Sequence, residues 1–187
     1  MATVRLLLGI FCLVVCGRLD LPRRSFLAPA QRFSEAVADG FANPEAERVL
    51  AIARTQIGVT ELTGNNDGKA VTRYLESVGL PVGQPWCAAF ISWVFAEAGY
   101  SAPRTGWSPA LFPLTKRKSK AFKGAVFGVY FPSLKRIAHV GLLECIEGEW
   151  LVTIEGNTNQ EGSREGEGVY RKRRPISSIR FYADWLR

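Results

Sequence analysis

The chain has 187 residues, of which 47% are hydrophobic and 22% charged, and its formal net charge is +7 at pH 7. This length fits one domain with a short extension, and the composition is that of a globular protein with a sizeable core. The charge is uneven, because residues 1–30 hold four Arg and one Asp (+3), which leaves +4 for the rest. The mildly basic body suits an anionic polymer, but no nucleic-acid-binding motif is present, so nucleic acid is not an expected partner.

The first 17 residues have the pattern of an export signal. Arg5 gives a positively charged start, and residues 6–16 form an apolar run that is too short to span a bilayer comfortably. We therefore expect residues 1–17 to be a signal peptide, with a retained hydrophobic anchor in contact with the membrane as the alternative. Both interpretations predict a secreted, periplasmic or cell-envelope protein, and we expect a monomer.

Residues 18–43 are predicted to be a linker, and residues 44–187 to form one domain that begins with helices. Asn43 and Pro44 are typical of an N-cap followed by a first-turn proline. Apolar residues then keep helical spacing up to Gly58, which predicts a first helix.

A loop signal over residues 63–68 separates this helix from a second one, which is expected to end at Gly79. Asn65 and Asp67, together with Glu61, can line a cleft or hold Ca²⁺. Because calcium loops carry more carboxylates, caps and turns are the favoured interpretation. We keep Asn65 and Asp67 as candidate substrate-binding residues.

A third helix is predicted over residues 86–98, after Pro85 and before Gly99. It is apolar nearly all round, which is typical of a buried helix. Cys87 falls in its first turn, where the helix dipole lowers the pKa of a thiol and free N–H groups can hold an oxyanion. Trp86, just before it, is a further candidate for substrate binding.

The second half of the domain is rich in strands, so we predict an α+β fold with helices packed on an antiparallel sheet of about five to six strands. Residues 101–124 form a long irregular connection whose basic run, residues 116–120, is expected to be a solvated surface. The predicted strands cover residues 125–131, 138–146, 150–155, 168–174 and 179–185.

His139 is the only histidine, so any imidazole chemistry must use it. Together with Cys87 and a carboxylate or amide from the next strand, Glu155 or Asn157, it supplies the parts of an activated thiol. One His and few Cys make a zinc site improbable, and we expect no metal or cofactor. Cys145 lies in a strand and is predicted to be an inert core thiol.

Three blocks of this sequence resemble the CHAP domain, the cysteine- and histidine-dependent amidohydrolase/peptidase family related to NlpC-type cell-wall peptidases. They are residues 84–93 (QPWCAAFISW), 138–141 (AHVG) and 154–158 (IEGNT). The resemblance covers about residues 44–187 and implies a papain-like fold. It also implies that Cys87 is the nucleophile, His139 the general base and Glu155 the residue that orients it, with help from Asn157.

The resemblance implies hydrolysis of amide bonds in peptidoglycan peptides through a thioester, by an N-acetylmuramoyl-L-alanine amidase or an endopeptidase. Two alternatives stay open. One is a thiol acyltransferase or deamidase on the same scaffold, and the other is a non-catalytic wall-binding domain.

The chemistry also predicts the register of one hairpin. For Glu155 or Asn157 to orient His139, all three side chains must share a face of the sheet, which requires a loop with an odd number of residues. We therefore expect a three-residue loop over residues 147–149 that pairs Ile146 with Trp150. In that register Asn157 faces His139 directly, and Glu155 reaches the ring along the diagonal.

Overall fold

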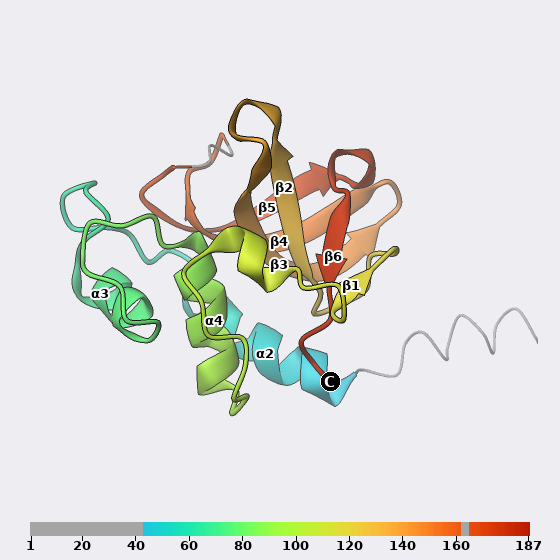
Figure 1. Cartoon of the computed structure of the whole chain (residues 1–187), viewed down its shortest axis with the longest axis horizontal. Helices are drawn as coiled ribbons and strands as arrows, with labels where there is room; N and C mark the ends of the chain where they lie inside the picture. Colours follow the sequence, from blue (N-terminus) through green and yellow to red (C-terminus); the bar gives the residue numbers. More distant parts are fainter. Residues whose placement is uncertain (1–42, 162–164) are drawn as a thin grey trace, which may run out of the picture. The chain divides into compact units, whose positions relative to one another are not determined.

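The computed structural model describes residues 43–161 and 165–187. The predicted signal segment and all of the predicted linker except Asn43 lie outside the described residues. Within them, three α-helices come first: α2 (Pro44–Thr55), α3 (Lys69–Glu76) and α4 (Cys87–Glu97). Strands and short 3₁₀ helices follow, so helices and strands are separated along the chain (Figure 1).

The strands form a six-stranded antiparallel sheet in the order β1-β6-β2-β3-β4-β5. This confirms the predicted α+β class and the predicted arrangement in which a helix that begins at a cysteine packs on an antiparallel sheet. The strands are β1 (Arg117–Lys118), β2 (Val126–Phe131), β3 (Arg136–Glu147), β4 (Trp150–Thr158), β5 (Gly168–Pro175) and β6 (Phe181–Ala183), and the 3₁₀ helices are η1 (Ser108–Leu111), η2 (Pro132–Leu134) and η3 (Ile176–Ser178).

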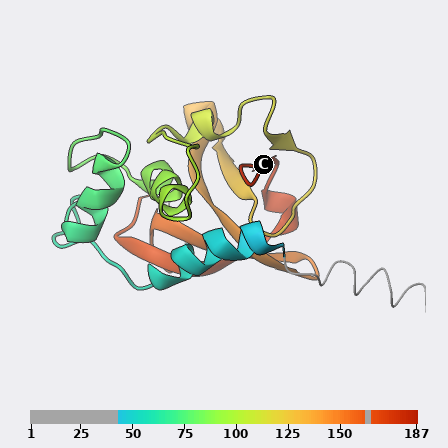
Figure 2. The same ribbon diagram turned by 90° about the horizontal axis from the view of Figure 1, so that it is seen from below.

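Helix α4 lies at the centre of the main core, where it packs against α2, α3 and strands β3 and β4 (Figures 1 and 2). Its residues from Cys87 to Phe95 are all buried, as its apolar sequence predicts. A smaller apolar cluster, which includes Phe127, Leu143 and Leu151, forms separately from this core. None of the described helices is long and apolar enough to cross a membrane.

Two predicted segments differ from the structure. The basic run over residues 116–120 is more than a solvated surface, because Arg117 and Lys118 pair with β6 as a short edge strand. The last strand is shorter than predicted and covers only Phe181–Ala183. It begins two residues later than predicted because the turn of η3 closes just before it, with the Ile179 N–H bonded to the Ile176 carbonyl.

The β3–β4 hairpin closes through a two-residue turn, because Glu147 pairs with Trp150 and leaves only Gly148 and Glu149 between them. The prediction of a three-residue loop with Ile146 opposite Trp150 is therefore wrong. Gly148 has a φ of 57°, the positive φ that a two-residue hairpin turn requires. The turn has a favourable twist, but the pairing that it sets would place His139 and Glu155 on opposite faces of the sheet.

A β-bulge in β3 corrects this register, so that the two side chains share a face. The register shifts by one residue at Glu144. On the side of the bulge nearer His139, Leu143 pairs with Thr153 and Leu142 with Ile154. This is the register that a three-residue loop would have produced. His139 and Glu155 consequently share one face of the sheet, as the chemistry requires, although the sequence argument reached this result by the wrong route.

Candidate active site

Cys87 is the first residue of α4, and its side chain is almost fully buried at 4% exposure. It lines a cleft of about 540 Å³. Its Sγ lies 3.5 Å from the Ser108 hydroxyl. Burial raises the pKa of the Cys87 thiol, but the hydrogen bond and charge of His139, together with Ser108 and the Val140 backbone, outweigh burial and lower it.

His139 is buried on β3 and uses its two ring nitrogens differently. Its Nε2 lies 2.7 Å from the Glu155 carboxylate, whereas its Nδ1 has no hydrogen-bond partner among the described residues. The Cys87 thiol is near enough for each group to shift the other's pKa, although no hydrogen bond of normal geometry joins them. Nδ1 is therefore the open position of the ring that can exchange a proton with the thiol.

The charge on His139 is favoured despite its burial. Burial alone would lower the pKa of the imidazole, but the hydrogen bonds and charges of Cys87 and Glu155 raise it to about 9. Because the thiol pKa is lowered at the same time, the site favours a thiolate beside an imidazolium. This is the reactive form of a nucleophilic cysteine.

Glu155 is fully buried on β4 and is the carboxylate that holds the ring, as predicted. Arg174 donates to both of its oxygens, at 2.6 and 2.5 Å, and the Thr153 hydroxyl donates at 2.6 Å. Burial would raise the pKa of Glu155, but Arg174 and then His139 lower it to about 2. The carboxylate therefore stays ionised beside the histidine.

The diagonal approach of Glu155 to His139 depends on Gly141. A Cβ at this position would lie 2.7 Å from Cγ of Glu155 and 2.7 Å from the Phe127 ring. Any larger residue would push the carboxylate off the strand, so glycine is needed for this close approach.

Ser108 and Arg174 were missed in the sequence analysis. Ser108 lies in η1, within the stretch predicted to be an irregular connection, and no spacing rule connects it to Cys87. Arg174 belongs to a basic run on β5 in which exposed and half-buried residues alternate. Because side chains alternate along a strand, Arg174 lies on the half-buried face of β5, unlike the exposed Arg171 and Arg173. This face can be assigned once β5 is known to pair with β4.

None of the hydrogen bonds found for Asn157 among the described residues goes to His139, so its help in orienting the ring stays a prediction. Its Oδ1 accepts from the backbone N–H of Trp86 at 3.1 Å, and its Nδ2 donates to Asn66 Oδ1 and to the Gly166 carbonyl. The pairing of β4 with β5 becomes irregular after Glu155, and Asn157 has a positive φ of 56°. Asn157 holds the backbone at the start of α4.

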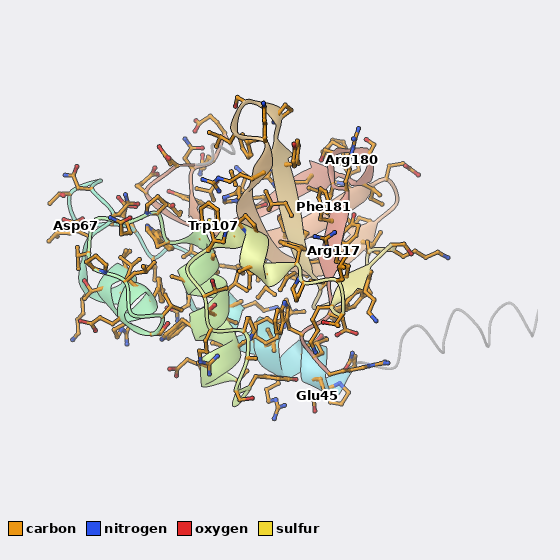
Figure 3. The ribbon with its side chains drawn as sticks, in the orientation of Figure 1. Glu45, Asp67, Trp107, Arg117, Arg180 and Phe181 are labelled. Carbon is orange, nitrogen blue, oxygen red and sulfur yellow. The ribbon has the colours of Figure 1, made fainter. Side chains whose placement is uncertain are left out.

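The three predicted substrate-binding residues are also placed differently. Trp86 is fully buried and its indole N–H donates to Glu61, so it presents no surface to a ligand. Asp67 accepts from Thr63 and the Leu62 backbone N–H within its own loop. Neither Asp67 nor Asn65 lines the cleft of Cys87. Figure 3 shows Asp67 on an outer loop, well away from Trp107 of the cleft.

Cys145 is half-buried rather than a core residue. It lies on β3 beyond the bulge, close to the turn, where its neighbours Ile146 and Trp150 are 46% and 42% exposed. Burial, followed by the charges of Glu147 and Glu144, raises the pKa of its thiol, in contrast to Cys87.

The fold and the site together define an α+β domain in which a helix-borne thiol, an imidazole and a buried carboxylate line up at one end of the sheet. No protein-family model matches the chain, and no curated protein sequence matches it. Solved structures with a similar chain path include the NlpC/p60 domain of the peptidoglycan hydrolase SagA, with 17% identity over 74% of this chain and 97% of that one, at a TM-score of 0.44.

Two structures of Ly7917 are also similar. One is the protein with the hydrolyzing product of MDP (18% identity, 73% of this chain, TM-score 0.40), and the other is Ly7917 itself (16% identity, 73% of this chain, TM-score 0.41). The chain spans 61% and 60% of the length of these two structures. Identities and TM-scores of this size are no argument for a shared activity, so the chemistry is argued from the residues of this chain.

Proposed function

We propose that this chain is a cysteine hydrolase that cleaves amide bonds in peptidoglycan peptides, as an N-acetylmuramoyl-L-alanine amidase or an endopeptidase. The observation that supports the chemistry is the His139 ring, which is held by the buried Glu155 carboxylate and has its free nitrogen available to the Cys87 thiol. The resemblance of three sequence blocks to CHAP domains supports the choice of substrate. We further propose that the protein is exported and acts in the cell envelope.

In the first half of the reaction, the Cys87 thiolate attacks the carbonyl carbon of the amide and the C=O electron pair moves onto oxygen. His139, as the imidazolium, gives its Nδ1 proton to the leaving nitrogen, the C–N bond breaks, and a free amine and a thioester remain. Glu155 keeps the ring oriented and stabilises its positive charge.

In the second half, neutral His139 takes a proton from water, which attacks the thioester carbonyl. The C–S bond then breaks, which releases a carboxylic acid and restores the thiolate–imidazolium pair. Two kinds of donor are available for the oxyanion. The backbone N–H of Cys87 belongs to the first turn of α4, which has no intrahelical acceptor. Gln84 lines the same cleft, and its side chain makes no hydrogen bond within the described ranges.

The test is to digest purified peptidoglycan with the wild-type protein and with Cys87→Ala, and to weigh the released fragments. We expect new amines and carboxylic acids from the wild type only, and no new reducing sugar ends. Release of a new amine by hydrolysis separates this function from acyl transfer, in which an amine is consumed. A Cys87→Ala variant that digests the wall like the wild type would contradict the proposal.

A further inference from the structure

The cleft in front of Cys87 is positively charged. Besides Cys87, the ionisable residues in its lining are Arg104 and Arg136, and no carboxylate of residues 43–161 or 165–187 lines it. None of the ion pairs found among the described residues includes either arginine. By contrast, Arg54, Arg171 and Arg174 pair with glutamates elsewhere. The two cleft arginines therefore place uncompensated positive charge beside the nucleophile.

Arg136 is held in a position from which it can bind a ligand. Its guanidinium lies 4.3 Å from the centre of the Trp107 ring, and one nitrogen donates to the Ile137 carbonyl at 3.2 Å. Trp107 is 53% exposed and lines the cleft, so the stacked pair faces its opening. Stacking fixes the plane of the guanidinium but leaves most of its N–H donors free, which suits two parallel hydrogen bonds to a carboxylate.

Arg104 is fixed by backbone carbonyls rather than by an acid. Its guanidinium donates to the carbonyls of Tyr100, Ser92 and Pro103 at 2.5, 3.3 and 2.6 Å. These contacts use much of its hydrogen-bonding capacity but do not cancel its charge. Arg104 therefore adds a positive potential to the cleft without being the main donor to a ligand.

We propose that the cleft selects peptides that carry a free carboxylate close to the scissile amide, with Arg136 as the binding residue and Arg104 as a source of positive potential. This inference rests on the proposed function and names its substrate class. Arg136 precedes His139 by three positions on β3, which is about 10 Å of extended strand. The carboxylate is therefore expected within about three residues of the bond that is cut.

The first test compares wall-peptide fragments with free carboxylates and the same fragments after amidation of those carboxylates. We expect amidation to lower kcat/KM of the wild type by about 10-fold or more, the loss of a charge-assisted pair of hydrogen bonds. Arg136→Gln should cleave both fragments at the same low rate. Arg173→Gln, which changes an exposed arginine on β5 paired with Glu147, is the control and should keep the wild-type preference. Equal cleavage of free and amidated fragments by the wild type would overturn the inference and leave the proposed function intact.

The second test needs no wall substrate. Iodoacetate and iodoacetamide differ mainly in charge, and the alkylated peptide that contains Cys87 can be quantified by mass spectrometry. We expect the ratio of the iodoacetate rate to the iodoacetamide rate to fall about 2- to 15-fold in Arg136→Gln at low ionic strength, from Coulomb's law over about 10 Å. Arg136→Lys should keep most of the ratio. An unchanged ratio in a folded Arg136→Gln protein would overturn the anion preference, whereas a fall in the ratio without any wall cleavage would support it and count against the wall substrate alone.

Discussion

Replacing Glu155 by Gln separates the charge of this residue from its hydrogen bond. A glutamine amide oxygen can still accept from His139 Nε2, so the ring keeps a partner while the negative charge is lost. Arg174, which donates to both carboxylate oxygens in the wild type, is left without its anion. Both changes act against the imidazolium, so we expect the pKa of His139 to fall.

The size of the effect follows from the site. A pKa of about 9 instead of 6.5 for His139 corresponds to about 3 kcal/mol in favour of the imidazolium, part of which comes from Glu155. A charge-assisted hydrogen bond contributes about 1.5–3 kcal/mol. Its loss predicts a His139 pKa lower by about one to two pH units and a kcat/KM lower by about 10- to 150-fold.

The assay is the pH dependence of two rates, cleavage of wall fragments and alkylation of Cys87 by iodoacetamide. In the wild type the thiolate–imidazolium pair persists until His139 loses its proton near pH 9, so the alkaline limb of the cleavage rate lies there. In Glu155→Gln this limb should move to lower pH. The alkylation rate reports the thiolate, so its rise with pH should move to higher pH in Glu155→Gln, even where no substrate is cleaved.

Glu144→Gln is the matched control. Glu144 is also a buried glutamate of the sheet held by arginines, here Arg54 and Arg171, but it does not contact His139. Its replacement should lower stability by weakening the bulge but, in the protein that stays folded, leave the pH profile in place. If Glu155→Gln kept the wild-type alkaline limb and alkylation rate, the reasoning that Glu155 sustains the imidazolium would be refuted.

Four further outcomes are expected. Asn157→Ala should lower stability by about 2 kcal/mol, measured by urea unfolding, because the buried Trp86 N–H loses its acceptor, while the pH profile stays unchanged. Arg174→Met should cost about 3–5 kcal/mol because it leaves Glu155 buried without its cation, whereas Arg173→Met, from an exposed pair, should cost at most about 1 kcal/mol. Because the pKa of Glu155 is lowered to about 2, this residue adds stability above pH 4.5 that is lost as the pH falls toward 2. The difference in unfolding free energy between wild type and Glu155→Gln should therefore shrink by about 3 kcal/mol over that range. Expression of the full chain in a bacterium should give a mature N-terminus that lacks the first 17 to 30 residues, and N-terminal sequencing that finds an intact Met1 on a cytoplasmic product would contradict export.

The parts of the site that could be predicted are those set by local chemistry. The apolar run after Pro85 predicts a buried helix with Cys87 at its start, and His139 is the only imidazole in the chain. For Cys87 and His139, one residue type and its immediate neighbours carried the information. The reach of Glu155 to His139 also follows from side-chain alternation on paired strands, although the predicted turn was wrong.

The parts that could not be predicted depend on pairing between distant segments. Arg174 contacts Glu155 only because β5 lies beside β4, and Ser108 meets Cys87 through a loop without periodicity. Asn157 has the residue type expected of an orienting amide, and the contact that the sequence does not predict is its hydrogen bond to the Trp86 N–H at the start of α4. A residue's type limited its possible roles, and the tertiary contacts selected among them.

The bulge in β3 shows how such contacts support the site. A two-residue turn suits the twist of the hairpin, but alone it would put His139 and Glu155 on opposite faces, so one strand must carry an extra residue. That residue is Glu144, and a carboxylate buried to 8% exposure needs cations. Arg54 from α2 and Arg171 from β5 provide them, at 2.7 and 2.6 Å. The ion pairs that neutralise Glu144 therefore stabilise the register on which the contact between His139 and Glu155 depends, although none of them touches the reacting atoms.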